Sequence, residues 1–172
     1  MGESTREHLK ELLESFDTAI LITRHGEKDH ARPMAIAGVE GANTVWFVTS
    51  RSSPKTEELR KDSYVALTFQ SSRRFVVLSG RGAIVDDRAK LTELWKPGFT
   101  VWFPNGKDDP DATLIRVTVT DAEFWDSAGA KGIRYAFEAA KSLLTKEPPE
   151  ELPGQHGRVT SGANGEPLSK PH

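Results

Sequence analysis

The amino-acid sequence predicts a mainly β protein with flanking helices, folded as a small antiparallel barrel or sandwich. Three observations support this prediction: about seven short runs of apolar or β-branched residues, few helical patterns, and turn residues of the hairpin type between consecutive runs. A doubly wound parallel sheet is excluded, because it needs a helical crossover between successive strands.

The first element expected is an amphipathic helix near the N-terminus. Ser4 and Glu7 have capping-box spacing, and apolar residues recur from Leu9 to Phe16 with the helical period. From residue 18 the pattern changes to short apolar or β-branched runs, which indicates an antiparallel meander. The strands are expected at 18–23, 31–37 and 44–50.

A short helix is expected after the third strand. Ser52 or Ser53 is a candidate N-cap, Pro54 suits the first helical position, and basic residues close the segment. Each of these residues has a physical reason to stand at a helix boundary, so the helix is expected over residues 52–62.

The next two runs, 63–70 and 74–85, are expected to form a hairpin that turns at residues 71–73. Gly80 and Gly82 lie within the second run. Because glycine in a strand often marks a bulge or a sharp bend, they indicate the curvature that a barrel requires.

Asp86 or Asp87 is then expected to cap a helix that runs through Leu94. The stretch 95–110 is rich in aromatic residues, Gly and Pro and has no clear period, so it is interpreted as an ordered functional loop or a broken helix. Two further strands are expected at 113–120 and 122–127.

The C-terminal part divides into a helix and a tail. A final amphipathic helix is expected over 132–146, which closes a single domain of residues 1–146. Residues 147–172 contain many Pro, Gly and polar residues and almost no apolar ones. They are expected to form a disordered or extended tail that contributes nothing to the core.

Composition excludes several classes of function. The 23 Lys and Arg nearly balance the 25 Asp and Glu, giving a formal net charge of −2, so no global field favours nucleic acid or anionic lipid. The absence of cysteine excludes disulfides and thiol nucleophiles, and any redox chemistry must come from a cofactor. No signal peptide and no run of about 18 apolar residues is visible, so we expect a cytoplasmic protein that does not bind membranes.

One set of residues has the chemistry of a phosphate site. Arg32 stands at the start of a strand, and Thr49, Ser50, Ser53 and Lys55 surround the end of the next strand and the start of a helix. Two cations, several hydroxyls and free helix N–H groups suit a terminal phosphate, since charge-assisted hydrogen bonds contribute about 1.5–3 kcal/mol each. The alternative is that Arg32 and Lys55 are solvated surface charges and Ser53 is only a cap.

A series of motifs along the chain is similar to the pyridoxamine 5′-phosphate oxidase-like superfamily, and in its later members to the general stress protein branch. The resemblance spans approximately residues 9–126. The motifs are Arg32-Pro33-Met34, Thr49-Ser50-Arg51-Ser52-Ser53-Pro54-Lys55, Ser79-Gly80, Asp86-Asp87-Arg88, Trp95, Trp102-Phe103-Pro104-Asn105-Gly106, Asp109-Pro110 and Glu123-Phe124-Trp125-Asp126.

This resemblance implies a split β-barrel, a Greek-key-like antiparallel barrel, that binds flavin mononucleotide (FMN). It also implies a homodimer with each flavin in the cleft between the subunits. The residues expected to contact FMN are Arg32, Pro33, Met34, Thr49, Ser50, Ser53, Lys55, Trp102 and Phe103. Trp102 and Phe103 are expected to reach a flavin held mainly by the other subunit; the alternative is that they are core or interface anchors.

The implied function is a flavin-dependent oxidoreductase linked to the general stress response. True pyridoxamine oxidases carry a C-terminal Trp and Arg at the substrate site, whereas Arg158 here falls in the expected tail, so synthesis of pyridoxal phosphate is not expected. No side chain stands out as an acid, a base or a nucleophile. A non-catalytic flavin-binding or redox-sensing stress protein is therefore the alternative, and FAD, haem or a deazaflavin are alternative cofactors.

No metal site is expected. The five histidines lack metal-ligand spacing. The acidic residues Asp108, Asp109 and Asp111 surround Pro110, and turn formation is the simpler interpretation of that cluster.

Overall fold

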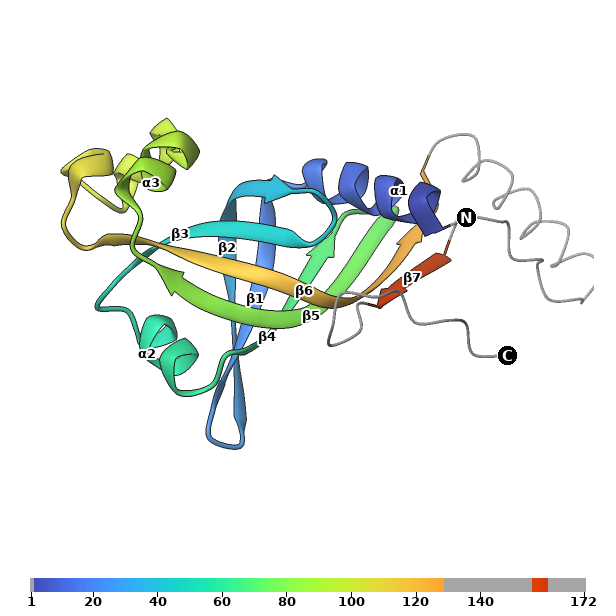
Figure 1. The fold of residues 1–172 in the computed structure, drawn as a ribbon, viewed down its shortest axis with the longest axis horizontal. Helices are drawn as coiled ribbons and strands as arrows, with labels where there is room; N and C mark the ends of the chain where they lie inside the picture. Colours follow the sequence, from blue (N-terminus) through green and yellow to red (C-terminus); the bar gives the residue numbers. More distant parts are fainter. Residues whose placement is uncertain (1, 129–155, 161–172) are drawn as a thin grey trace, which may run out of the picture.

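An antiparallel β-barrel forms the centre of the computed structural model, which describes residues 2–128 and 156–160 (Figure 1). Neighbouring strands follow the order β3-β2-β1-β4-β5-β6, and β6 also pairs with β3, so the sheet closes on itself. The strands are β1 (Thr18–His25), β2 (Lys28–Glu40), β3 (Thr44–Ser50), β4 (Tyr64–Gln70), β5 (Arg74–Val85) and β6 (Ala112–Asp126). This confirms the expected barrel and excludes the sandwich.

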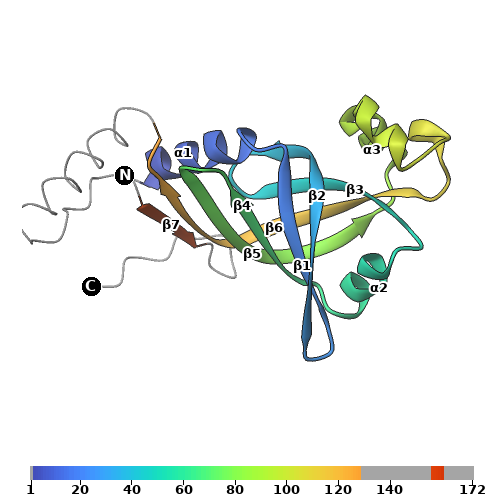
Figure 2. The same ribbon diagram turned by 180° about the vertical axis from the view of Figure 1, so that it is seen from behind.

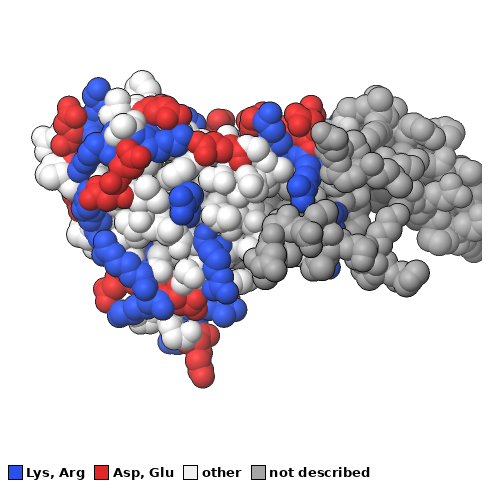
Figure 3. Space-filling view, viewed as in Figure 1, with Lys and Arg blue, Asp and Glu red and all other residues white. Residues whose placement is uncertain are grey.

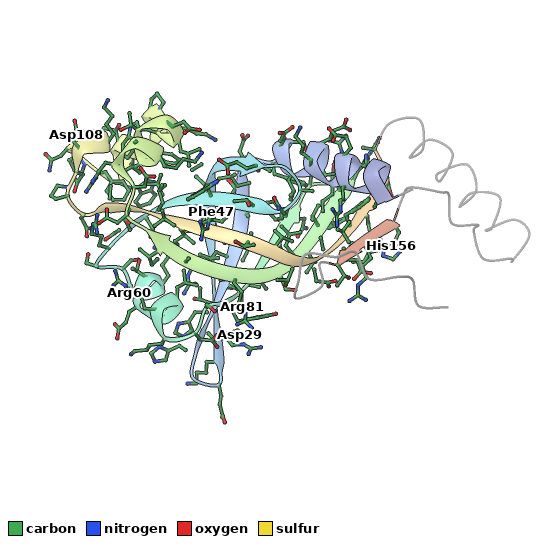
Figure 4. All side chains as sticks on the ribbon, in the orientation of Figure 1. Asp29, Phe47, Arg60, Arg81, Asp108 and His156 are labelled. Carbon is green, nitrogen blue, oxygen red and sulfur yellow. The ribbon has the colours of Figure 1, made fainter. Side chains whose placement is uncertain are left out.

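The barrel is filled by apolar side chains that alternate along its strands with outward-facing residues. Leu21, Phe47 and Leu67 are completely buried there, and Phe47 lies within the barrel in Figure 4. Helix α1 (Gly2–Glu14) packs Leu9 and Leu13 into the same core. The apolar stripe of the N-terminal segment therefore has the role that its period predicts.

Glycine allows β5 to bend. The register between β5 and β6 shifts between Ser79 and Gly80, which confirms the expected bulge. A Cβ on Gly80 would lie 2.1 Å from the carbonyl oxygen of Thr118, so no larger residue fits without movement of the backbone.

Two short helices flank the barrel, one after the end of β3 and one after the end of β5, and both of these strand ends pair with the start of β6. Helix α2 (Pro54–Lys61) has Ser53 at its N-cap and Pro54 in its first turn, as predicted. The Ser53 hydroxyl makes no capping bond and instead contacts the Thr56 hydroxyl at 3.0 Å. Helix α3 (Arg88–Leu94) is capped by Asp87, whose carboxylate accepts a hydrogen bond from the Lys90 amide at 2.9 Å.

The segment after α3 is an ordered loop with two 3₁₀ turns, η1 (Pro97–Val101) and η2 (Gly106–Asp108), as the aromatic-rich stretch predicts. With α3 it covers the outside of the barrel and forms a second apolar cluster. The cluster contains Ala37, Trp46, Val48, Leu91, Phe99, Phe103, Ala112 and Leu114.

Three expectations about local structure are wrong. Helix α1 begins at Gly2, so Ser4 lies inside it and not at the N-cap position. The two strands expected at 113–120 and 122–127 are one continuous strand, β6. Residues 112–118 of β6 close the barrel against β3, and residues 114–126 pair with β5.

The third correction concerns the expectation that residues 147–172 contribute nothing to the core. Residues His156–Thr160 form β7, which pairs with β6 (Figure 2). Val159 packs against the barrel core, and Arg158 pairs with Asp121 at 3.2 Å, so this part of the tail does contact the folded domain. The helix expected at 132–146, the domain boundary after residue 146 and the rest of the tail lie outside the described residues.

Within the described ranges, no helix is long and apolar enough to cross a membrane.

Candidate functional site

Helix α2 and the hairpin of β1 and β2 border a cavity of about 790 Å³. The helix lies beside the hairpin in both ribbon views (Figures 1 and 2). The residues that line the cavity are Arg24, His25, Gly26, His30, Arg32, Pro54, Lys55, Glu57, Glu58, Lys61 and Asp62. Lys and Arg are prominent in this part of the surface in Figure 3. A cavity of this size falls in the range of ligand sites, roughly 300–1,000 Å³.

Glu58 lies at the base of the cavity and is only 4% exposed. Its Oε2 accepts hydrogen bonds from the Thr23 hydroxyl and, at 3.0 Å, from Nη2 of Arg32. Its Oε1 lies 2.7 Å from Nδ1 of His30. One carboxylate thus connects α2 with both strands of the hairpin.

Glu58 is ionised at neutral pH. Burial alone would raise the pKa of its carboxyl group, but the hydrogen bonds from Thr23, His30 and Arg32, together with the Arg32 charge, outweigh burial and lower that pKa to about 2. The carboxylate is therefore a permanent acceptor that fixes the guanidinium of Arg32, whose Nη1 also donates to Thr23.

Lys55 lies on the same wall and is half-buried. No side chain in the described ranges forms a hydrogen bond or an ion pair with its ammonium group. Burial lowers the pKa of Lys55, the nearby Arg32 charge lowers it further, and Glu58 opposes both. Two neighbouring cations thus share one carboxylate, and the cavity has a surplus of positive charge at this point.

Residues 4–150 match the family model described as pyridoxamine 5′-phosphate oxidase like. The chain belongs to this family. A curated relative, protein bli-3 of Neurospora crassa, is 27% identical over 129 residues, which cover 67% of this chain. The chain spans 62% of the length of that relative.

Solved structures agree with this assignment to the pyridoxamine 5′-phosphate oxidase-like family. A general stress FMN/FAD binding protein from Xanthomonas citri has 29% identity and a TM-score of 0.64 over 74% of this chain and 92% of its own. A Clostridium acetobutylicum protein related to general stress protein 26 has 26% identity and the same TM-score over 73% and 91%. The chain therefore belongs to the general stress protein branch, and its barrel is the family's split β-barrel.

The hydroxyls expected to bind phosphate lie next to the cavity of this family member but do not line it. Thr49 is buried, and its hydroxyl lies 3.4 Å from that of Ser53. The Ser50 hydroxyl donates to Asp111 and lies 2.9 Å from the Ser52 hydroxyl. Arg32 and Lys55 are thus the two expected phosphate ligands whose side chains meet in the cavity wall.

The remaining expected flavin contacts lie on β2 and in the aromatic loop. Pro33 is exposed, and Met34 packs partly against the barrel core. Phe103 is buried in the second cluster with its ring 6.0 Å from that of Trp95, which agrees with the core-anchor alternative. Trp102 is 77% exposed and leaves its indole free for a contact outside the subunit.

The sequence interpretation missed Glu58, Thr23, His25 and His30. The helical spacing could have indicated Glu58: it follows Lys55 by three residues, so the two side chains lie on the same face of α2. His30 similarly precedes Arg32 by two residues on β2 and so points to the same side of the strand. The register places Thr23 opposite His30, which the hairpin length could have indicated.

Proposed function

We propose that the protein binds FMN at the cavity between α2 and the β1–β2 hairpin, with the phosphate held by Arg32 and Lys55. The observation that carries this proposal is the half-buried Lys55 cation, which lies near Arg32 without an acidic partner of its own among the described side chains. A phosphate monoester carries about −1.5 to −2 charges near pH 7 and would neutralise this surplus.

The side chains present fit a phosphate. Arg32 is already oriented by Glu58 and Thr23, so binding costs little side-chain entropy. Lys55 is the second residue of α2, where the helix N-terminus also favours an anion. The similarity to a general stress FMN/FAD binding protein supports a flavin as the ligand, and the phosphate fit favours FMN.

We extend the proposal to a homodimer with the flavin in the cleft between subunits. Within the described ranges, the cavity lining contains no Phe, Tyr or Trp and thus no large apolar wall for a flat isoalloxazine ring. Val101 and Trp102 are 79% and 77% exposed on the aromatic loop. An exposed indole of this kind suits a ring that is bound mainly by a second copy of the chain.

When bound, FMN would supply electron transfer, and a flavin-dependent oxidoreductase linked to the stress response is the activity we propose. One observation favours the alternative, a non-catalytic flavin-binding protein. Glu58, the buried carboxylate of the cavity, is already engaged by Thr23, Arg32 and His30 and is not free to act as a general base. Reduction of the bound flavin by NADH or NADPH supports the enzyme, and tight binding without reduction supports the alternative.

The binding proposal is tested by titrating FMN and riboflavin, which lacks the phosphate, against the purified protein. Arg32→Ala and Lys55→Ala are each expected to weaken FMN by roughly 10- to 100-fold and riboflavin far less, because each removes a charge-assisted contact. Lys10→Ala, on α1 and away from the cavity, is the control and is expected to leave both affinities unchanged. Equal affinity of the wild-type protein for FMN and riboflavin contradicts the proposal.

A further inference from the structure

Two histidines stack face to face in the wall of the cavity. The rings of His25 and His30 have centroids 5.4 Å apart and an interplanar angle of 9°. Their side chains are 63% and 45% exposed, so both rings are open to solvent and to a ligand. Neither histidine has a role in the phosphate site proposed above.

Glu58 fixes how His30 presents its second ring nitrogen. An ionised carboxylate can only accept a hydrogen bond. Nδ1 of His30 therefore carries the hydrogen and donates a hydrogen bond to Oε1 of Glu58, 2.7 Å away. In the neutral ring, Nε2 then has a lone pair and would face an anion unfavourably. When the ring is protonated, Nε2 becomes a donor. Nδ1 of His25 lies 3.8 Å from the same carboxylate oxygen.

The charged groups around the two rings come from all three bordering elements. On β1, Arg24 lies 4.0 Å from Asp29 of β2, and Arg32 of β2 is held by Glu58. On α2, Lys55 is unpaired by the described side chains, while Lys61 binds Glu57 at 2.7 Å. Asp62 follows at the end of the helix.

The net charge of the cavity wall depends on whether the two histidines are protonated. Four permanent cations and three carboxylates line the cavity, so the wall is nearly balanced when both imidazoles are neutral. Protonation of the two rings makes the same wall clearly positive. The cavity's attraction for an anion therefore depends on the state of His25 and His30.

We infer that His25 and His30, with His30 oriented by Glu58, form a protonation-dependent third arm of the phosphate site beside Arg32 and Lys55. This inference rests on the proposed FMN site. The protonated pair adds an N–H donor and positive charge on the side of the cavity formed by the hairpin. The protein consequently takes up protons as it binds FMN, and the contribution of the pair to affinity grows as the pH falls.

The experiment compares FMN affinity from pH 5.5 to 8.5 in the wild-type protein and in the double variant His25→Gln/His30→Gln. Glutamine keeps an N–H donor for Glu58 but does not titrate. Since the FMN phosphate itself titrates near pH 6, the measured quantity is the ratio of the two affinities at each pH, from which the ligand's own titration cancels. This ratio is expected to rise about tenfold from the alkaline to the acidic end.

The matched control is His156→Gln. His156 is also stacked on an aromatic ring and also contacts a carboxylate, since its ring lies 5.2 Å from Trp125 and its Nε2 lies 2.7 Å from Glu123. It belongs to β7, far from α2 (Figure 4). This variant is expected to follow the wild-type pH profile.

Calorimetry in buffers of different ionisation enthalpy gives an independent measurement. The wild-type protein is expected to take up more protons on binding FMN than the double variant does. Parallel pH profiles, or equal proton uptake, would overturn the inference while leaving the FMN site intact. If the wild-type protein does not prefer FMN over riboflavin at any pH, the proposed phosphate site itself is wrong. His30→Gln alone, with a circular dichroism check of folding, repeats the test with a smaller change.

Discussion

Arg32 donates a hydrogen bond from Nη2 to Oε2 of Glu58 at 3.0 Å, which joins strand β2 to helix α2 across the candidate site. The contact has two consequences. It orients the guanidinium of Arg32 before any ligand binds. It also means that the buried carboxylate of Glu58, on α2, is stabilised by a residue of β2 in the barrel. Stability and the proposed phosphate binding therefore depend on the same carboxylate.

Glu58→Gln is expected to lower the free energy of unfolding at pH 7 by about 2 kcal/mol, allowing for solvent screening at the half-exposed partners. The substitution leaves the Arg32 guanidinium without its counter-ion and replaces the charged acceptor of the His30 hydrogen bond by a neutral amide. Chemical denaturation of the two proteins measures the loss. Glu57→Gln, an exposed neighbour that pairs with Lys61, is the control and should change little.

The same carboxylate predicts how acid acts on the protein. Because folding lowers the pKa of Glu58 from 4.5 to about 2, its contribution is complete above pH 4.5 and is lost as the pH falls through about 2. The stability difference between the wild-type protein and Glu58→Gln should shrink across this window. A difference that stays constant from pH 5 to pH 2 contradicts the assignment.

Lys55→Met is expected to separate stability from binding. Burial and the Arg32 charge lower the pKa of Lys55, so its charged form is disfavoured in the fold and the wild-type protein gains stability as the pH rises toward 10.5. The variant should be slightly more stable at pH 7, by less than about 1 kcal/mol, and should lack that gain. Its FMN affinity should nevertheless fall.

The control for this variant is Lys61→Met, because Lys61 lines the same cavity but is exposed and paired with Glu57. It should show no gain in stability. A Lys55→Met protein that is clearly less stable than the wild-type protein would mean that the ammonium group has a stabilising partner.

Local chemistry explains which parts of the fold were predictable. Pro54 and Asp87 mark helix starts through their own backbone and side-chain properties, so α2 and α3 follow directly from the sequence. Strand β7 could not be predicted in this way. Its composition is that of a tail, and its order comes from pairing with β6, which is distant in the sequence.

The candidate site shows the same division. Arg32 and Lys55 stand out because cations beside a helix start suit a phosphate. Glu58 instead follows Glu57 in a charged helix, where a solvated position is the simpler reading of the sequence. Its burial results from the β1–β2 hairpin, which places Thr23 and Arg32 over α2, and helical periodicity contains no information about that contact.

Trp102→Ala is expected to weaken the proposed dimer. The indole is 77% exposed in the single subunit, and removal of a Trp from the centre of an interface commonly costs 2 kcal/mol or more, roughly 30-fold in affinity. Light scattering over a dilution series measures the change. Trp125→Ala is the control, because Trp125 stacks on His156 within its own subunit. A wild-type monomer that retains FMN contradicts the dimer proposal.

Gly82→Ala tests whether the packing of α2 on the barrel positions the site. A Cβ on Gly82 would lie 2.7 Å from Cδ2 of Leu59, a buried residue of α2, and 2.8 Å from Cγ1 of Val65. Relief of this overlap requires the side chains of Leu59 and Val65 to shift, and because both are buried we expect α2 to move outward with Lys55 and Glu58. The expected cost is about 1–2 kcal/mol of stability, together with weaker FMN binding in the folded protein.

Two other glycines make this result specific. Gly98→Ala meets no atom within 4 Å and should leave stability and FMN affinity unchanged. Gly80→Ala meets the backbone of Thr118 and should be the least stable of the three, but its bulge lies on β5 and β6, away from the cavity lining. Folded Gly80→Ala protein should therefore bind FMN more tightly than folded Gly82→Ala protein. The reverse order would show that α2 does not depend on Gly82 for its position.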